Sequence, residues 1–165
     1  MTEQAIKLIT FYKGWENYQQ SLVESIAPLS PEQLALPIAL HQRPIGVLLG
    51  HMVGARIFWF QGWMGEGNPD LAHGDDDEQS VPEAAELVAG FEATWHMIAG
   101  ALARWTPADL EQLFPTPAFM SEEARENFPP RTRQWIIWHV LEHEIHHGGE
   151  LSLALGGYGL TTFYD

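Results

Sequence analysis

Apolar residues recur every three or four positions in four stretches of the chain, and polar residues fill most positions between them. This spacing places the apolar side chains on one face of an α-helix, so each stretch is predicted to be an amphipathic helix. Proline or glycine residues stand near the ends of the stretches, where such residues start or stop helices. The predicted helices cover residues 6–26, 44–64, 81–105 and 131–155. Four tryptophans on these helices are predicted to lie in the core: Trp59, Trp95, Trp135 and Trp138.

The segments between the predicted helices lack this periodicity. Residues 66–81 include a run of four acidic residues and are predicted to form a solvated loop. Residues 112–130 contain four prolines and are predicted to form a long irregular connection that crosses the bundle. Residues 29–34 and 105–110 share the pattern of a capped helical turn. With no strand pattern, the sequence predicts an all-α fold, an antiparallel four-helix bundle with long crossing loops, as a single domain over residues 1–165.

The chain has 165 residues and a net charge of −14, from 8 basic and 22 acidic residues. This charge repels nucleic-acid phosphates and anionic lipids, so neither nucleic acid nor a membrane is an expected partner. The most apolar stretch, Ile45 to Met64, is interrupted by His51, Arg56 and Gln61, which argues against a membrane span. The first residues lack the pattern of a secretory signal. We therefore expect a cytoplasmic protein that acts on a small molecule.

Four of the eight histidines lie between residues 139 and 147, and the chain contains no cysteine. His143 and His147 are four residues apart, so on a helix their imidazoles stand one above the other, about 40° apart, and can chelate one ion. Further along the chain, residues 48–51 line up with residues 140–143, which suggests two related helical hairpins and places His51 and His143 at comparable depths, facing each other. His51 can then supply a third nitrogen. Three protein ligands with an open coordination position are typical of a catalytic metal site.

Other interpretations of these residues remain open. A lone buried histidine, such as His51 taken by itself, is usually a hydrogen-bonded core residue. His139 and His143 have the same four-residue spacing, while His139 and His146 are placed to support the ligands or to face outward. Glu150 follows on the same helix face, where it either orients a ligand imidazole or is an exposed glutamate.

Residues 143–147 also match the H-E-x-x-H motif of zinc peptidases, in which Glu144 would be the general base. Peptidases of this type place a third ligand downstream, whereas no histidine follows His147. We therefore rank peptide hydrolysis low and keep Glu144 as a candidate group beside the metal.

At these residues the sequence resembles the DinB/YfiT-like family, whose members are four-helix bundles with a three-histidine metal site. The resemblance covers nearly the whole chain and rests on His51 followed eight residues later by Trp59, and on the signature over residues 139–147. It implies the metal ligands His51, His143 and His147. Many relatives carry Arg-Gly-Gln after the last ligand, whereas residues 148–150 are Gly-Gly-Glu here, so a cation beside the site is missing. The two glycines within a helix also imply close packing or ligand access at that point.

Characterised members of this family include transferases and isomerases that use a low-molecular-weight thiol such as bacillithiol, mycothiol or glutathione. The resemblance implies a metal-dependent enzyme with one divalent ion, zinc or nickel in the first place and iron as another choice. A metal with an open position can stabilise a thiolate, which gives a chain without cysteine a sulfur nucleophile. The alternatives are a metal-dependent hydrolase and a metal-binding or stress-related protein without turnover. A homodimer is compatible with the family.

Overall fold

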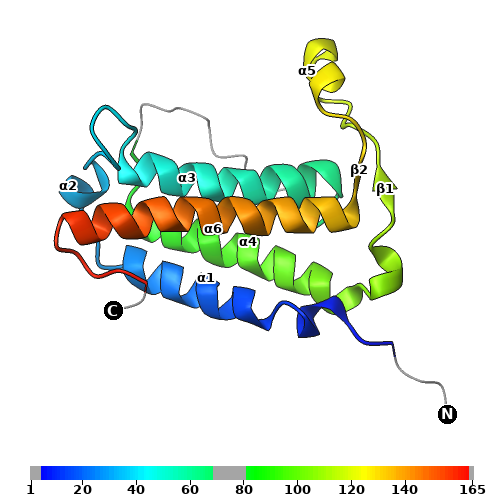
Figure 1. Cartoon of the computed structure of the whole chain (residues 1–165), viewed down its shortest axis with the longest axis horizontal. Helices are drawn as coiled ribbons and strands as arrows, with labels where there is room; N and C mark the ends of the chain where they lie inside the picture. The colour runs from blue at the N-terminus through cyan, green and yellow to red at the C-terminus, as the bar shows by residue number, and fades with distance from the viewer. Residues whose placement is uncertain (1–4, 69–80, 164–165) are drawn as a thin grey trace.

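The computed structural model describes residues 5–68 and 81–163, and its main elements are four long helices that lie side by side (Figure 1). They are α1 (Lys13–Ile26), α3 (Ile45–Arg56), α4 (Ala84–Arg104) and α6 (Arg133–Gly157). Helix α3 continues without a break as a π-helical segment, η2 (Ile57–Trp63). The predicted all-α four-helix fold is confirmed.

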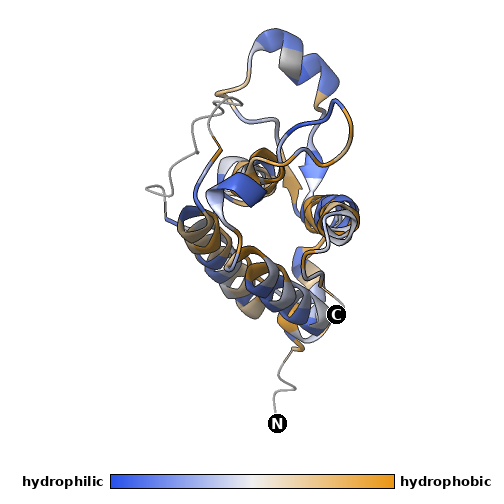
Figure 2. Ribbon diagram, turned by 90° about the vertical axis from the view of Figure 1, so that its left-hand side faces the viewer, coloured by the Kyte–Doolittle hydropathy of each residue, from blue (hydrophilic) through white to orange (hydrophobic). Residues whose placement is uncertain are grey.

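The bundle is held by three closely packed helix pairs: α3 packs against α4 and against α6, and α1 packs against α4. Figure 2, turned by 90° from the first view, shows apolar and polar positions distributed around the same helices. The apolar positions form two buried clusters, one around Trp15, Phe60 and Ile137, and the other around Leu22, Leu48 and Leu155. None of the helices in the described ranges is both long enough and apolar enough to cross a lipid bilayer.

The first helix begins at Lys13 rather than at residue 6. The preceding residues form a short 3₁₀ turn, η1 (Leu8–Thr10), in which Leu8 is buried and its backbone N–H donates to the Trp105 carbonyl at 2.9 Å. This contact redirects the chain, so Ile6 and Phe11, which the predicted helix placed on its apolar face, are exposed. A long-range backbone hydrogen bond therefore outweighs the local helical periodicity.

The connection over residues 112–130 is more regular than predicted. Its ends pair as two short antiparallel strands, β1 (Leu113–Phe114) and β2 (Arg131–Thr132), and between them lies a short helix, α5 (Glu122–Asn127), which projects away from the bundle (Figure 1). Two-residue strands are too short to show an alternating pattern, which is why the sequence did not reveal them. The predicted acidic loop falls largely on residues 69–80, outside the described residues.

Both predicted capped turns are confirmed. Ser30 caps α2 (Pro31–Leu34): its side chain accepts from the Gln33 backbone N–H, and its own N–H donates to the Gln33 side chain. Thr106 and Asp109 form the same reciprocal arrangement at the 3₁₀ turn η3 (Pro107–Asp109). Such capping boxes satisfy backbone donors that a helix start leaves unpaired.

A buried ion pair joins α3 to α6 at the centre of the bundle. The guanidinium of Arg56 donates to both carboxylate oxygens of Glu144, at 2.5 and 2.9 Å, and both side chains are fully buried. Arg56 also donates to Gln19 of α1 and to Thr94 of α4, and the Trp15 indole N–H donates to Glu144 at 2.8 Å. These residues form a buried ion-pair network that connects all four long helices.

The two consecutive glycines of α6 are predicted to respond in opposite ways to alanine. A Cβ at Gly148 would overlap the Tyr18 hydroxyl, which donates to the Glu144 carbonyl at 2.7 Å, whereas a Cβ at Gly149 meets no atom within 4 Å. Gly148→Ala should therefore lower the free energy of unfolding by about 1–3 kcal/mol through overpacking. Gly149→Ala should raise it by about 0.5–1 kcal/mol because a flexible helix residue is removed. Urea unfolding of the metal-free variants measures both, and equal signs would contradict the packing at Tyr18.

Candidate metal centre

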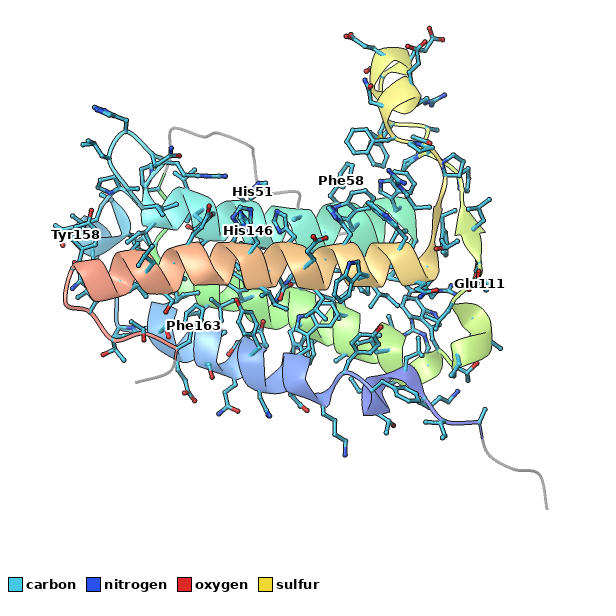
Figure 3. All side chains as sticks on the ribbon, in the orientation of Figure 1. His51, Phe58, Glu111, His146, Tyr158 and Phe163 are labelled. Atoms are coloured by element: carbon cyan, nitrogen blue, oxygen red, sulfur yellow. The ribbon has the colours of Figure 1, made fainter. Side chains whose placement is uncertain are left out.

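Three histidines converge on the face where α3 meets α6. His51 comes from α3, and His143 and His147 stand one turn apart on α6; Figure 3 labels His51 on α3 and His146 on α6. The Nε2 atoms of His51 and His143 are 3.0 Å apart, and one ligand atom from each of the three histidines lies within 4.8 Å of the others. Two imidazole nitrogens bound to one tetrahedral zinc ion lie roughly 3.3 Å apart. The three side chains, which we call the histidine triad, can therefore hold one metal ion.

The protonation state of His143 favours the binding of a metal ion. Burial, followed by the charges that His147 and His51 would carry, lowers the pKa of His143 to about 3. His143 is therefore neutral at physiological pH, which is the form that binds a metal. Its Nδ1 atom is buried and finds no hydrogen-bond partner among the residues that the structure describes.

Glu150 fixes the orientation of His147. The two side chains are joined by a hydrogen bond of 2.7 Å between Nδ1 of His147 and Oε2 of Glu150. The carboxylate accepts a hydrogen bond from the Nδ1–H group, so the Nε2 lone pair is left for a metal. The same hydrogen bond is the main cause that holds the pKa of Glu150 below its ordinary value.

A sequence profile of the DinB superfamily matches residues 15–151, a span that includes the whole histidine triad. The chain belongs to the DinB superfamily. Among solved structures, a DinB-like protein from Bacillus cereus ATCC 10987 has a similar fold, with a TM-score of 0.73 and 20% sequence identity. That alignment covers 96% of this chain and 97% of the other. A search of curated proteins gave no match. The predicted DinB-like fold is confirmed.

The described residues of this DinB-superfamily chain offer a second group of potential ligands, formed by His146, His147 and Glu150. His146 Nε2 lies 3.5 Å from Glu150, and its side chain is 67% exposed. In this group the Nδ1 atom of His147 and the carboxylate of Glu150 already satisfy each other. The histidine triad is therefore the better fit to an ion, and His146 lies at its outer edge.

Glu144 is held away from any role as a general base. Its two carboxylate oxygens accept hydrogen bonds from Arg56 and Trp15, and its side chain has no exposed surface. A general base must reach the proton that it removes. The H-E-x-x-H motif in this DinB-superfamily chain is therefore a coincidence of spacing, in which the glutamate belongs to the buried ion-pair network.

His139 forms part of an aromatic wall next to the histidine triad. Its ring stacks on Trp135 with centroids 4.7 Å apart, and Trp59 contacts it edge-on at 4.9 Å. The His139 and His143 rings are 6.3 Å apart, and burial lowers the pKa of His139. The structure thus places His139 with aromatic side chains, one turn away from the triad.

A shallow pocket of about 490 Å³ opens beside the triad and is lined by residues that include His143, His139 and Trp138. Trp138 is 58% exposed, so its predicted place in the core is wrong, whereas Trp59 is buried as expected. Sequence reasoning also missed the buried role of Arg56. A charged residue in the most apolar stretch of the chain was the available signal, because such a charge needs a buried partner.

Proposed function

We propose that this DinB-superfamily protein is a metal-dependent enzyme that uses a low-molecular-weight thiol in a transfer or isomerisation reaction. The observation that carries the proposal is the histidine triad, in which three imidazole nitrogens from two helices converge and the His51 side chain is exposed to solvent. A site with three protein ligands and an open side is the arrangement of catalytic rather than structural metals.

The donor set suits a divalent transition metal. Imidazole nitrogens bind zinc, nickel, iron and copper, whereas magnesium and calcium prefer oxygen ligands. We propose zinc or nickel as the resident ion, with iron as the next choice. The ion would be held by His51, His143 and His147, and Glu150 would maintain the tautomer of His147 through the hydrogen bond described above.

Sulfur chemistry requires a thiol from outside, because the chain has no cysteine. A bound divalent ion lowers the pKa of a thiol that coordinates it, so that the thiolate is available at neutral pH. The protein side chains would bind and orient the thiol and its substrate. The aromatic wall at His139 bounds the pocket in which they would lie. The hydrogen bond with His147 is the main cause that lowers the pKa of Glu150, and the charge of Arg43 is the last of the causes that act in the same direction.

A hydrolase of the H-E-x-x-H type has no support in the geometry, because Glu144 is occupied. A metal-binding protein without turnover would share the histidine triad and differ only in lacking a reaction. The pocket beside His143 favours the enzyme, since a storage or structural site has no need of an adjoining cavity.

The proposal is tested by thiol consumption. Protein loaded with zinc or nickel is mixed with glutathione, bacillithiol or mycothiol and a set of electrophilic acceptors, and remaining thiol is measured with a chromogenic thiol reagent. In the expected reaction the sulfur bonds to an electrophilic carbon, the leaving group departs, and the thiol proton passes to solvent. Consumption should depend on the metal and be lost in His147→Ala. Equal rates with the metal-free protein would reject the transferase, and metal binding without any consumption would leave an isomerase, which regenerates its thiol, or a role without turnover.

A further inference from the structure

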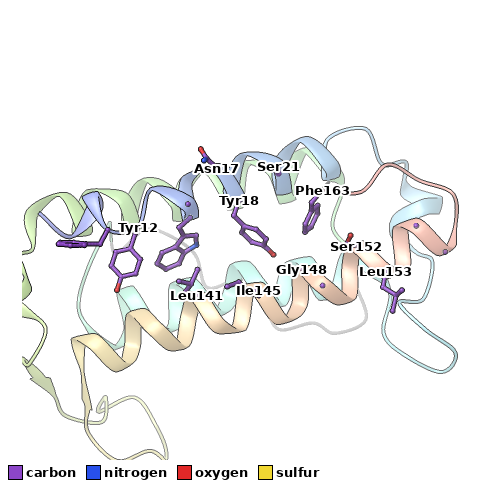
Figure 4. A pocket seen from close by; sticks show the side chains of 16 residues that line it. Tyr12, Asn17, Tyr18, Ser21, Leu141, Ile145, Gly148, Ser152, Leu153 and Phe163 are labelled. Atoms are coloured by element: carbon purple, nitrogen blue, oxygen red, sulfur yellow. The ribbon is translucent and has the colours of Figure 1, made fainter. Parts of the chain in front are cut away.

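A second, larger hollow lies between α1 and α6. This groove has a volume of about 1080 Å³ and is lined by 16 residues, none of which is Asp, Glu, Lys, Arg or His. Figure 4 shows Tyr12 and Tyr18 on the α1 side facing Leu141 and Ile145 of α6. An uncharged lining of this size is unusual in a chain with a net charge of −14. Its volume is at the upper end of the range of small-molecule sites.

None of the three triad histidines lines the groove, and Ile145 lines both the groove and the shallow pocket beside His143. Ser152 lines the groove, and at about 100° per residue it stands roughly 180° around α6 from His143. Glu144, with its buried ion-pair network, lies in the core between these two faces. A ligand in the groove would therefore not touch the metal ligands.

Hydrogen bonds fix the inner wall of the groove. Trp15 donates to the Glu144 carboxylate, and Tyr18 donates to the Glu144 carbonyl. The absence of a side chain at Gly148 makes room for the Tyr18 ring, and Gly14 on the opposite wall faces open space. The groove is thus formed by fixed side chains and by glycines, which is typical of a site that exists before its ligand arrives.

The middle of the groove, near Gly148, already holds an apolar side chain of the protein itself. Phe163, in the segment that follows α6, packs edge-on against Tyr18 with ring centroids 5.8 Å apart (Figure 4). The groove stays open on both sides of this ring: Phe11 and Ile145 are 62% and 55% exposed on one side, and Leu153 is 79% exposed on the other. The environment that accepts Phe163 thus continues along α6 without an occupant from the described chain.

Tyr12 supplies a polar group within the otherwise apolar groove. Its hydroxyl points toward α6 (Figure 4), and no residue in the described ranges makes a hydrogen bond with it. Partial burial raises the pKa of Tyr12, so the phenol stays protonated and able to donate. Water reaches this hydroxyl, so a ligand that accepts its hydrogen bond would replace a water molecule there.

We propose that the groove between α1 and α6 binds an elongated, uncharged apolar small molecule with one hydrogen-bonding group, such as a long-chain alcohol or ester. The charge of the chain selects against an anionic amphiphile, and the lining offers no carboxylate to pair with a cation. From Leu141 to Gly148, where the Phe163 ring packs, the lined part of α6 is about 10 Å long, and the lining resumes past Phe163 to Gly157, so the groove follows the helix axis and favours an extended molecule over a compact one.

The test is a fluorescence titration with the neutral apolar probe N-phenyl-1-naphthylamine, followed by its displacement with 1-dodecanol. The wild type should bind about one probe per chain with a Kd of roughly 1–10 µM, as expected for a small apolar ligand. Gly14→Leu fills the groove and should weaken binding at least about tenfold. Gly100→Leu is the matched control, because it also adds leucine to a helical glycine, on α4 and away from the groove.

Two further variants sharpen the result. Gly149→Leu fills the groove from the opposite wall and replaces Gly14→Leu if that variant fails to fold by circular dichroism. Tyr12→Phe should weaken displacement by 1-dodecanol about threefold or more while probe affinity is kept, because it removes only the hydrogen bond. Absent or unsaturable binding to the wild type, or equal binding by the filled variants, would overturn the proposal. The proposal would also be overturned if the wild type were a dimer that binds no probe and that dissociates when Gly14 is changed to Leu. The groove would then be the interface with a second copy of the chain.

Discussion

Loss of bound metal is the expected result when His143→Ala is purified without a metal-affinity tag. His143 contributes the Nε2 atom that lies 3.0 Å from that of His51, and its removal leaves two ligands where three converged. Wild type grown with zinc and nickel should carry about one ion per chain, and the variant should bind at least ~100-fold more weakly. Elemental analysis of the purified protein and a competition titration with a chromogenic chelator give both values.

Two other α6 variants make this result specific. His146→Ala removes a neighbouring imidazole that is mostly exposed and stands outside the triad, so it should keep its metal. Glu150→Gln keeps all three ligands but weakens the hydrogen bond that orients His147, and should lower affinity by about 10–100-fold. Equal metal content in wild type and His143→Ala would place the ion elsewhere, and absence of metal from the wild type under replete conditions would remove the basis of the proposed function.

The largest loss of stability is expected from Arg56→Met. This change leaves the Glu144 carboxylate buried with the Trp15 indole as its remaining side-chain donor in the described structure. Removal of one partner of a buried ion pair typically costs about 3–5 kcal/mol. Urea unfolding of the metal-free protein, followed by circular dichroism, measures the change in the free energy of unfolding.

The double variant Arg56→Met with Glu144→Leu separates the ion pair from its surroundings. Because both charges are then absent, it should lose less stability than Arg56→Met alone. Arg104→Met is the matched control: Arg104 pairs with Glu66, its side chain is 60% exposed, and such a pair contributes about 0–1 kcal/mol. A loss at Arg56 no larger than that at Arg104 would mean that the network adds little to stability.

The sequence predicted those parts of the fold that depend on neighbouring residues. Helical periodicity located the four long helices, and the capping residues Ser30 and Thr106 located two short turns. The start of the first helix was misplaced because Leu8 is held by Trp105, nearly a hundred residues away in the chain. Local patterns carry no information about such a contact.

The candidate site, like the fold, was predicted from the sequence only in part. Helix geometry alone predicted that His143 and His147 share one face. The alignment of residues 48–51 with residues 140–143 predicted that His51 lies opposite them. The environment of Glu144 did not follow, because its partners Arg56 and Trp15 are 88 and 129 positions away. The exposure of Trp138 was missed for a related reason: periodicity identifies an apolar face but not whether another helix covers it.

The ion pair between Arg56 and Glu144 has a consequence for the metal centre. Glu144 directly follows His143 on α6, and Arg56 lies five residues after His51 on α3. A slip of one helix past the other by a single turn would move the histidines about 5.4 Å, far more than a metal–nitrogen bond of about 2.0–2.1 Å tolerates. The same slip would separate the two buried charges. The bundle interior thus sets the axial register of the two helices that carry the ligands, so folding and metal affinity are constrained by one shared contact.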